Sequence, residues 1–161
     1  MIHNLIEIIG REAKLFESFL LVLEEQQQML VSNNLKGINK TTEAQRELLV
    51  QSQILNKERE ELTDKIKSAN AIEGDLNVTR LLEMVDKNQA EQLIKLKNII
   101  FSLHEQIGEV RNQNANLLNR SREYIARMMD MLARINTPSG SYGSTGAEEG
   151  KTNALAVDRR V

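Results

Sequence analysis

Apolar residues recur with helical spacing along most of the chain, up to about Ile135. The first segment contains two interleaved rows with a period of seven residues: Ile2, Ile9, Phe16, Leu23 and Leu30, and Ile6, Ala13 and Leu20. Rows of this kind place apolar side chains on one face of a helix that packs lengthwise on other helices. We therefore expect a first long helix here. Asn4 is its predicted N-cap, with Glu7 as the capping-box partner, and Ser32-Asn33-Asn34 is the predicted turn at its end.

A second, more polar helix is predicted to begin between Leu35 and Asn39 and to end within Asn70 to Asp75. Its apolar seam contains Leu48, Leu55, Leu62 and Ile66, whereas polar residues occupy the interleaved positions Gln45, Ser52 and Arg59. A short helix is expected from Val78 to Val85. The sequence leaves open whether Asp86 to Asn88 bend the chain or belong to one continuous helix.

The last predicted helix is the longest, from about Ala90 to Asn136, which corresponds to roughly 70 Å at the helical rise per residue. Its two heptad rows are Leu96, Leu103, Val110, Leu117, Tyr124 and Met131, and Ile100, Ile107, Asn114, Ser121, Met128 and Ile135. Ten of these twelve positions, all but Asn114 and Ser121, are apolar or aromatic. The helical repeat stops at Asn136-Thr137-Pro138, and polar residues dominate the rest of the chain.

These elements predict an all-α fold, an elongated antiparallel bundle of three long helices with a short helix between the second and the last. We expect a bundle domain at residues 1–136 and a flexible tail at residues 137–161. Because the last helix exceeds its neighbours in length, its C-terminal third is expected to extend beyond them with an uncovered apolar face. Uncovered apolar surface usually marks a partner site.

Charge and composition narrow the classes of function. The chain has 21 basic and 23 acidic residues, a net charge of -2 and no cysteine. Without a basic excess there is no case for nucleic-acid binding, and without cysteine there is no thiolate or disulfide chemistry. No secretion signal or segment long enough to span a bilayer is evident. We therefore expect a cytoplasmic protein that does not insert directly into a membrane.

No arrangement of residues typical of an enzyme is found. His3 and His104 lie on different predicted helices without a ligand pattern around them, and acid–base catalysis needs a positioned partner. The paired glutamates, such as Glu24-Glu25, are typical of solvated helix faces. We predict no catalytic residue, no metal and no cofactor.

Two features of the last helix have alternative interpretations. Asn114 interrupts an apolar row, so it either fixes the register of the helices, as buried Asn does in coiled coils, or contacts a partner. Met128, Met129 and Met131 either fill the core or form an adaptable binding surface, since Met side chains are flexible and polarizable.

The tail carries two further candidate segments. Tyr142-Gly143 precedes Gly146 by a few residues, and an apolar and basic patch occupies residues 154–161. Polar tails with short motifs of this kind can fold on binding a partner. The sequence leaves open whether the tail folds back on the bundle.

The layout resembles the FlgN-type flagellar export chaperones. The resemblance rests on the helical chain of this size, the glutamines that end the first helix, the run Asn114-Ala115-Asn116-Leu117-Leu118 and the segment Tyr142-Gly143-Ser144-Thr145-Gly146. It covers nearly the whole chain. Asn116 stands where a large aromatic residue beside Leu117 would be expected, and this departure bears on which subunit is preferred.

The resemblance implies a cytoplasmic chaperone for hook-associated proteins, the subunits of the hook–filament junction. Such a chaperone prevents premature assembly of its subunit and delivers it to the export gate. The resemblance places Asn114, Leu117 and Leu118 in the subunit-binding helix. The apolar residues of and around the Met cluster are further candidates for subunit binding: Ile125, Met128, Met129, Met131 and Leu132. Tyr142 and Gly143 match the motif linked to docking on the gate.

The same heptad rows also suit a structural coiled-coil adaptor or a dimerisation module. Both readings are compatible with a homo-oligomer. The stoichiometry of the chain alone and with a subunit distinguishes the two functions.

Overall fold

The computed structural model describes residues 1–136 and contains four helices there: α1 (Ile2–Val31), α2 (Leu35–Ala69), α3 (Val78–Met84) and α4 (Lys87–Asn136). The chain divides into two compact units, Met1–Ile125 and Ala126–Val161. The first holds α1, α2, α3 and most of α4, and the described part of the second is the last turns of α4. The predicted domain boundary after residue 136 stays a prediction, because the residues beyond it lie outside the described part.

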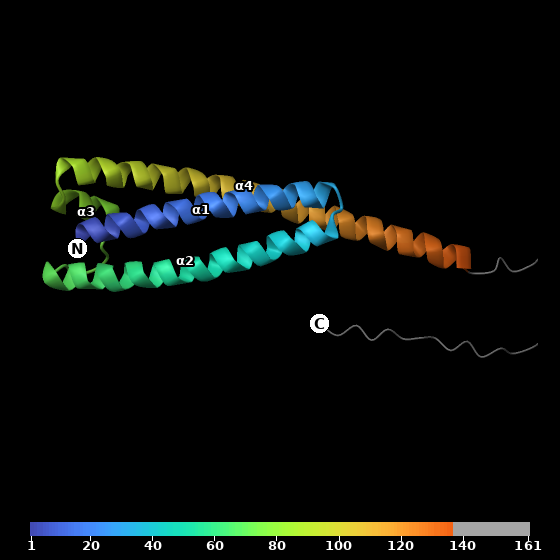
Figure 1. Ribbon diagram of the computed structural model, residues 1–161, viewed down its shortest axis with the longest axis horizontal. Helices are drawn as coiled ribbons and strands as arrows, with labels where there is room; N and C mark the ends of the chain where they lie inside the picture. Colours follow the sequence, from blue (N-terminus) through green and yellow to red (C-terminus); the bar gives the residue numbers. More distant parts are fainter. Residues whose placement is uncertain (137–161) are drawn as a thin grey trace, which may run out of the picture. The chain divides into compact units, whose positions relative to one another are not determined.

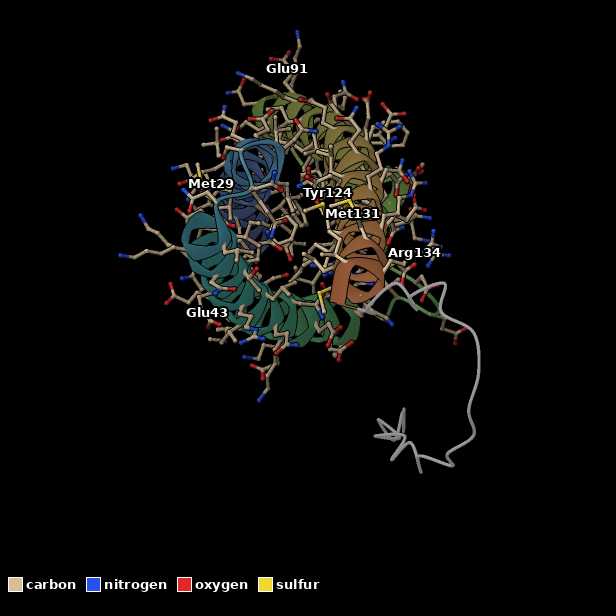
Figure 2. The ribbon with its side chains drawn as sticks, turned by 90° about the vertical axis from the view of Figure 1, so that its right-hand side faces the viewer. Met29, Glu43, Glu91, Tyr124, Met131 and Arg134 are labelled. Carbon is tan, nitrogen blue, oxygen red and sulfur yellow. The ribbon has the colours of Figure 1, made fainter. Side chains whose placement is uncertain are left out.

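Within Met1–Ile125 the three long helices lie side by side, and the short α3 lies at the end of the bundle where α1 begins (Figure 1). The chain runs along α1, returns along α2 and runs forward again along α4. The predicted all-α bundle of three long helices and one short helix is confirmed. Seen along the bundle, Glu43 of α2 and Glu91 of α4 point away from the interior (Figure 2).

Both α1 and α2 end in the same backbone motif. After α1 the amide of Asn34 donates to the carbonyl of Met29 (2.9 Å), and after α2 the amide of Ile72 donates to the carbonyl of Lys67 (3.0 Å). These bonds define Schellman motifs, which require a left-handed residue just past the helix. Asn33 (φ 52°) and Ala71 (φ 50°) occupy those positions. The predicted turn at Ser32 to Asn34 is therefore present.

Two helix starts differ from the sequence prediction. The first residue of α1 is Ile2, with Met1 as its N-cap, so Asn4 lies inside the helix and does not cap it. The last helix begins at Lys87, because Val85 is extended and the Asp86 carboxylate accepts a hydrogen bond from the amide of Gln89 (2.9 Å). The chain thus bends at Val85–Asp86, and α3 and α4 are separate helices.

The core is built around α1. At the end of the bundle near α3, its residues Leu5 and Ile6 cluster with Ile66 of α2, Leu81 of α3 and Leu93 of α4. Eight residues of α1 are buried, compared with three of the longer α2. They include Leu5, Ile8 and Leu15, which lie outside the two predicted rows. We attribute the wider buried arc to the position of α1 next to both other long helices.

Candidate functional site

The burial of α4 changes along its length. Leu93, Leu103 and Asn114 are buried, and no residue from 115 to 135 is buried. In this stretch, only Leu117 and Ser121 are half-buried. The heptad rows of α4 continue past Asn114, but the other described helices leave most of their side chains exposed there.

Several large apolar side chains are therefore exposed on this part of α4. In the first unit they are Leu118, Tyr124 and Ile125, and in the second unit they are Met128, Met129, Met131, Leu132 and Ile135. Met129 is 62% exposed and Ile125 is 60% exposed. Within each unit, spacings of three, four or seven residues place most of these side chains on one face of the helix. Exposed apolar surface of this extent usually marks a binding site.

Asn114 is located inside the bundle and is only 5% exposed. Its amide nitrogen donates to the carbonyl oxygen of Leu23 in α1 (2.9 Å) and lies 3.4 Å from the side-chain oxygen of Gln26. A helical carbonyl keeps a second lone pair for such a bond. This contact favours the interpretation of Asn114 as a residue that fixes register, and its assignment to subunit binding stays a prediction.

The glutamines at the end of α1 link all three long helices. Gln27 donates to the side-chain oxygen of Gln113 in α4 (2.8 Å), and Gln26 donates to the hydroxyl of Thr42 in α2 (3.4 Å). In the sequence these glutamines are only a polar run at the end of the first helix, and the pattern does not indicate their partners. The one signal in the sequence is that a partner, Gln113, stands next to Asn114, the polar residue in the apolar row of the last helix.

A second apolar surface lies between α2 and α4. Two adjoining cavities of about 680 and 170 Å³ share Phe16 of α1, Ser52 of α2, and Ile100 and His104 of α4. Together they form a groove with α1 at its base and α2 and α4 as its walls. Leu76, Val78 and Leu81 line the groove near α3. The apolar pattern of the sequence does not predict this groove.

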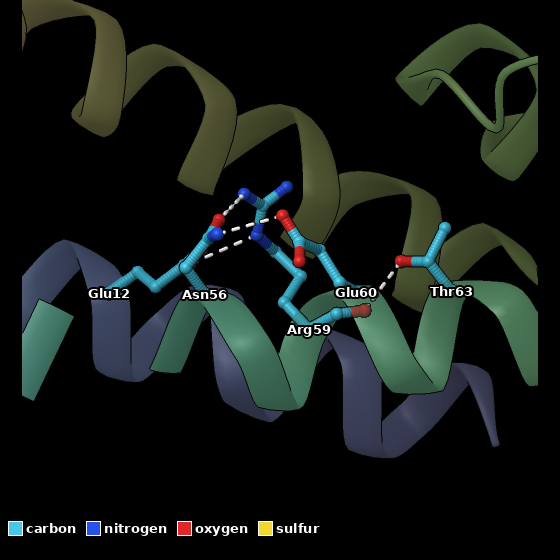
Figure 3. A network of polar contacts seen from close by, with 5 residues as sticks. All are labelled: Glu12, Asn56, Arg59, Glu60 and Thr63. Atoms are coloured by element: carbon cyan, nitrogen blue, oxygen red, sulfur yellow. Dashed lines mark hydrogen bonds and ion pairs between the residues drawn. The ribbon is translucent and has the colours of Figure 1, made fainter. Parts of the chain in front are cut away.

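A polar network borders this groove. Figure 3 shows Arg59 of α2 joined to Glu12 of α1, with 3.0 Å between Arg59 Nε and Glu12 Oε1. Arg59 also donates to Asn56, and Asn56 donates to Glu60 (2.8 Å). The Glu12 side chain is 15% exposed, so the guanidinium compensates a carboxylate that is largely withdrawn from water.

His104 is exposed at the groove, and within residues 1–136 no three acidic or histidine side chains gather in a way that could hold a metal ion. None of the described helices has the length and apolarity needed to cross a membrane. The predicted gate-docking residues Tyr142 and Gly143 lie outside the described residues.

Comparison with known proteins identifies the family. No curated protein and no solved structure matches the sequence. A family model described as FlgN protein matches residues 1–150, which is nearly the whole chain. This match agrees with a helical bundle that carries exposed apolar residues on its last helix. The chain therefore belongs to the FlgN family, whose members are chaperones of flagellar protein export.

Proposed function

We propose that this protein is a cytoplasmic chaperone that binds hook-associated subunits, prevents their premature assembly and delivers them to the flagellar export gate. The observation that supports the proposal best is the set of exposed apolar residues of α4, from Leu118 to Ile135, in a chain of the FlgN family. A helix that is apolar on one face and uncovered there is suited to pack against a helix of another protein.

The bound subunit helix would cover Leu117, Leu118, Ile125, Met128, Met129, Met131 and Leu132. Three methionines in this set would let the surface adjust to more than one subunit, because their side chains change rotamer at little cost. Asn114 would contribute to subunit binding indirectly, because its side-chain amide donates to the Leu23 carbonyl and so sets the position of α4 against α1.

Charge adds a preference for the partner. Residues 120–134 contain Arg120, Arg122, Arg127 and Arg134 but only two acidic residues, Glu123 and Asp130, so this part of α4 carries a net charge of +2. An acidic, amphipathic subunit helix would match both its apolar face and its charge. Covering that helix would also withhold it from the contacts of assembly.

Delivery would use the tail. Tyr142 and Gly143 are the proposed contacts with the export gate, and their separation from α4 by Pro138 and Gly140 would let the two partners bind independently. The subunit and the gate would then be held by different parts of one chain.

Sedimentation of the purified chain, alone and mixed with a hook-associated subunit, tests the proposal. We expect a discrete complex that contains both proteins. A stable homodimer that does not bind the subunit would support the alternative function, a coiled-coil adaptor, because the same apolar face would then be covered by a second copy.

A further inference from the structure

We infer that the groove between α2 and α4 is a second docking site, which takes an amphipathic helix of about four turns with acidic residues along its edge. The inference rests on the proposed function, because it assigns this helix to the exported subunit. It adds a site between residues 48–63 of α2 and residues 93–107 of α4, with α1 at its base, separate from the exposed apolar residues of α4 after Asn114.

The dimensions of the groove fit a helix. Its α2 wall extends from Leu48 to Thr63 and its α4 wall from Leu93 to Ile107. At the helical rise of about 1.5 Å per residue, both walls are roughly 21–23 Å long, which corresponds to about four helical turns. A helix laid along this groove would complete a four-helix bundle with α1, α2 and α4.

The lining explains why the groove is open. Ser52 and Arg59 occupy seam positions of α2 that would be apolar in a closely packed bundle, and both line the groove. Phe16, Ile100 and Leu93 supply apolar surface at the base and on the α4 wall. On the rim, Leu49 is 52% exposed and Phe101 is 66% exposed. The groove thus offers a large apolar area with a polar margin on the α2 side.

Charge distinguishes the possible occupants. The Arg59 guanidinium is paired with Glu12, whereas Lys97 of the α4 wall forms no ion pair with any described residue. An acidic residue on the bound helix would pair with Lys97. If a second copy of this chain inserted the exposed part of its own α4, the net charge of +2 on residues 120–134 would oppose contact with Lys97. The groove therefore favours an acidic helix from another protein.

Two groove variants and two matched controls test the inference by titration with a purified hook-associated subunit. Leu49→Glu and Phe101→Glu change exposed residues of the groove, and Val50→Glu and Ile94→Glu change residues of the same helices that do not line it. All four positions are 46–66% exposed, so the variants are expected to fold alike. We expect at least a tenfold rise in Kd for the groove pair and less than a twofold rise for the control pair. Lys97→Glu should weaken binding most at low salt.

A photo-cross-linker identifies the occupant directly. Phe101→p-benzoylphenylalanine in the full chain, mixed with the subunit, should cross-link to an acidic amphipathic segment of that subunit. The same substitution at Ile94 serves as the control. Cross-links to a second copy or to residues 137–161 of the same chain would overturn the inference.

The titration also separates failure of this inference from failure of the proposed function. If the groove variants bind like the wild type while Met129→Glu loses the subunit, the groove inference is wrong and the proposed function stands. If the wild-type chain does not bind the subunit, both are wrong.

Discussion

The side-chain amide of Asn114 in α4 donates a hydrogen bond to the backbone carbonyl of Leu23 in α1, 2.9 Å away, in a site where Asn114 is 5% exposed. The carbonyl oxygen of the same amide is buried without a hydrogen-bond partner. The bond therefore holds α4 in one register on α1 while leaving a buried polar atom unpaired, which costs about 1–3 kcal/mol.

Asn114→Asp should destabilise the bundle strongly. The substitution replaces the donor with an anionic oxygen that faces the Leu23 carbonyl in a buried site. We expect the free energy of unfolding to fall by about 2–4 kcal/mol, measured by urea denaturation followed by circular dichroism. Asn116→Asp changes an exposed residue two positions further along α4 and should cost less than about 0.5 kcal/mol. Equal losses would refute the buried contact.

Arg59→Ala should cost more than Arg46→Ala, although each removes an ion pair. Arg59 compensates Glu12, whose side chain is 15% exposed, whereas Arg46 and Glu43 are 70% and 66% exposed. We expect losses of about 1–2 kcal/mol and less than about 0.5 kcal/mol, respectively. Adding Glu12→Gln to Arg59→Ala should recover part of the loss in the same denaturation experiment, because the uncompensated charge is removed. No recovery would argue against a charge effect.

Ala71→Gly should stabilise the protein, since Ala71 has φ 50° at a position where glycine is free of steric strain. The expected gain is about 1 kcal/mol, or a rise in Tm of roughly 2–4 °C for a chain of this size. Asn33→Gly is the matched control at the end of α1, where φ is 52°. Asn tolerates this conformation better than Ala, so its replacement should change Tm less. A fall in Tm for Ala71→Gly would contradict the assignment of strain.

The sequence was sufficient to predict the helices because few residues interrupt their apolar rows. Leu103 and Leu23 lie in predicted rows and are buried, and the turn at Ser32 to Asn34 is formed by residues that favour such conformations. The start of α1 was misplaced because Asn4 and Glu7 match a capping box, yet the helix begins at Ile2. A capping pattern indicates that a start is possible without excluding an earlier one.

The groove could not be predicted from the sequence, because it depends on the distance in space between α2 and α4. Ser52 and Arg59 were recognised as polar seam residues, but the pattern does not show whether polar residues face water, a partner or each other. The pairing of Arg59 with Glu12 joins residues 47 positions apart. For the same reason, the partners of Gln26, Gln27 and Asn114 appeared only in the folded chain.

Deleting residues 137–161 should separate the two proposed tasks. Circular dichroism should show the helical signal of the bundle retained, and affinity for the hook-associated subunit should stay within twofold of the full chain. Binding to the export-gate component should fall at least tenfold. Tyr142→Ala in the full chain should reproduce that loss, and unchanged gate binding by both proteins would remove the tail from the mechanism.

A titration of two matched variants tests most directly whether the exposed apolar residues of α4 bind the subunit. Met129→Glu places a charge late in α4, where the wild-type side chain is 62% exposed. Leu21→Glu places one in α1, where the side chain is 65% exposed. Both should fold normally by thermal melting. We predict that Met129→Glu raises the Kd for the hook-associated subunit at least tenfold, about 1.4 kcal/mol, while Leu21→Glu changes it less than twofold. Equal affinity of the two variants and the wild type would contradict the claim.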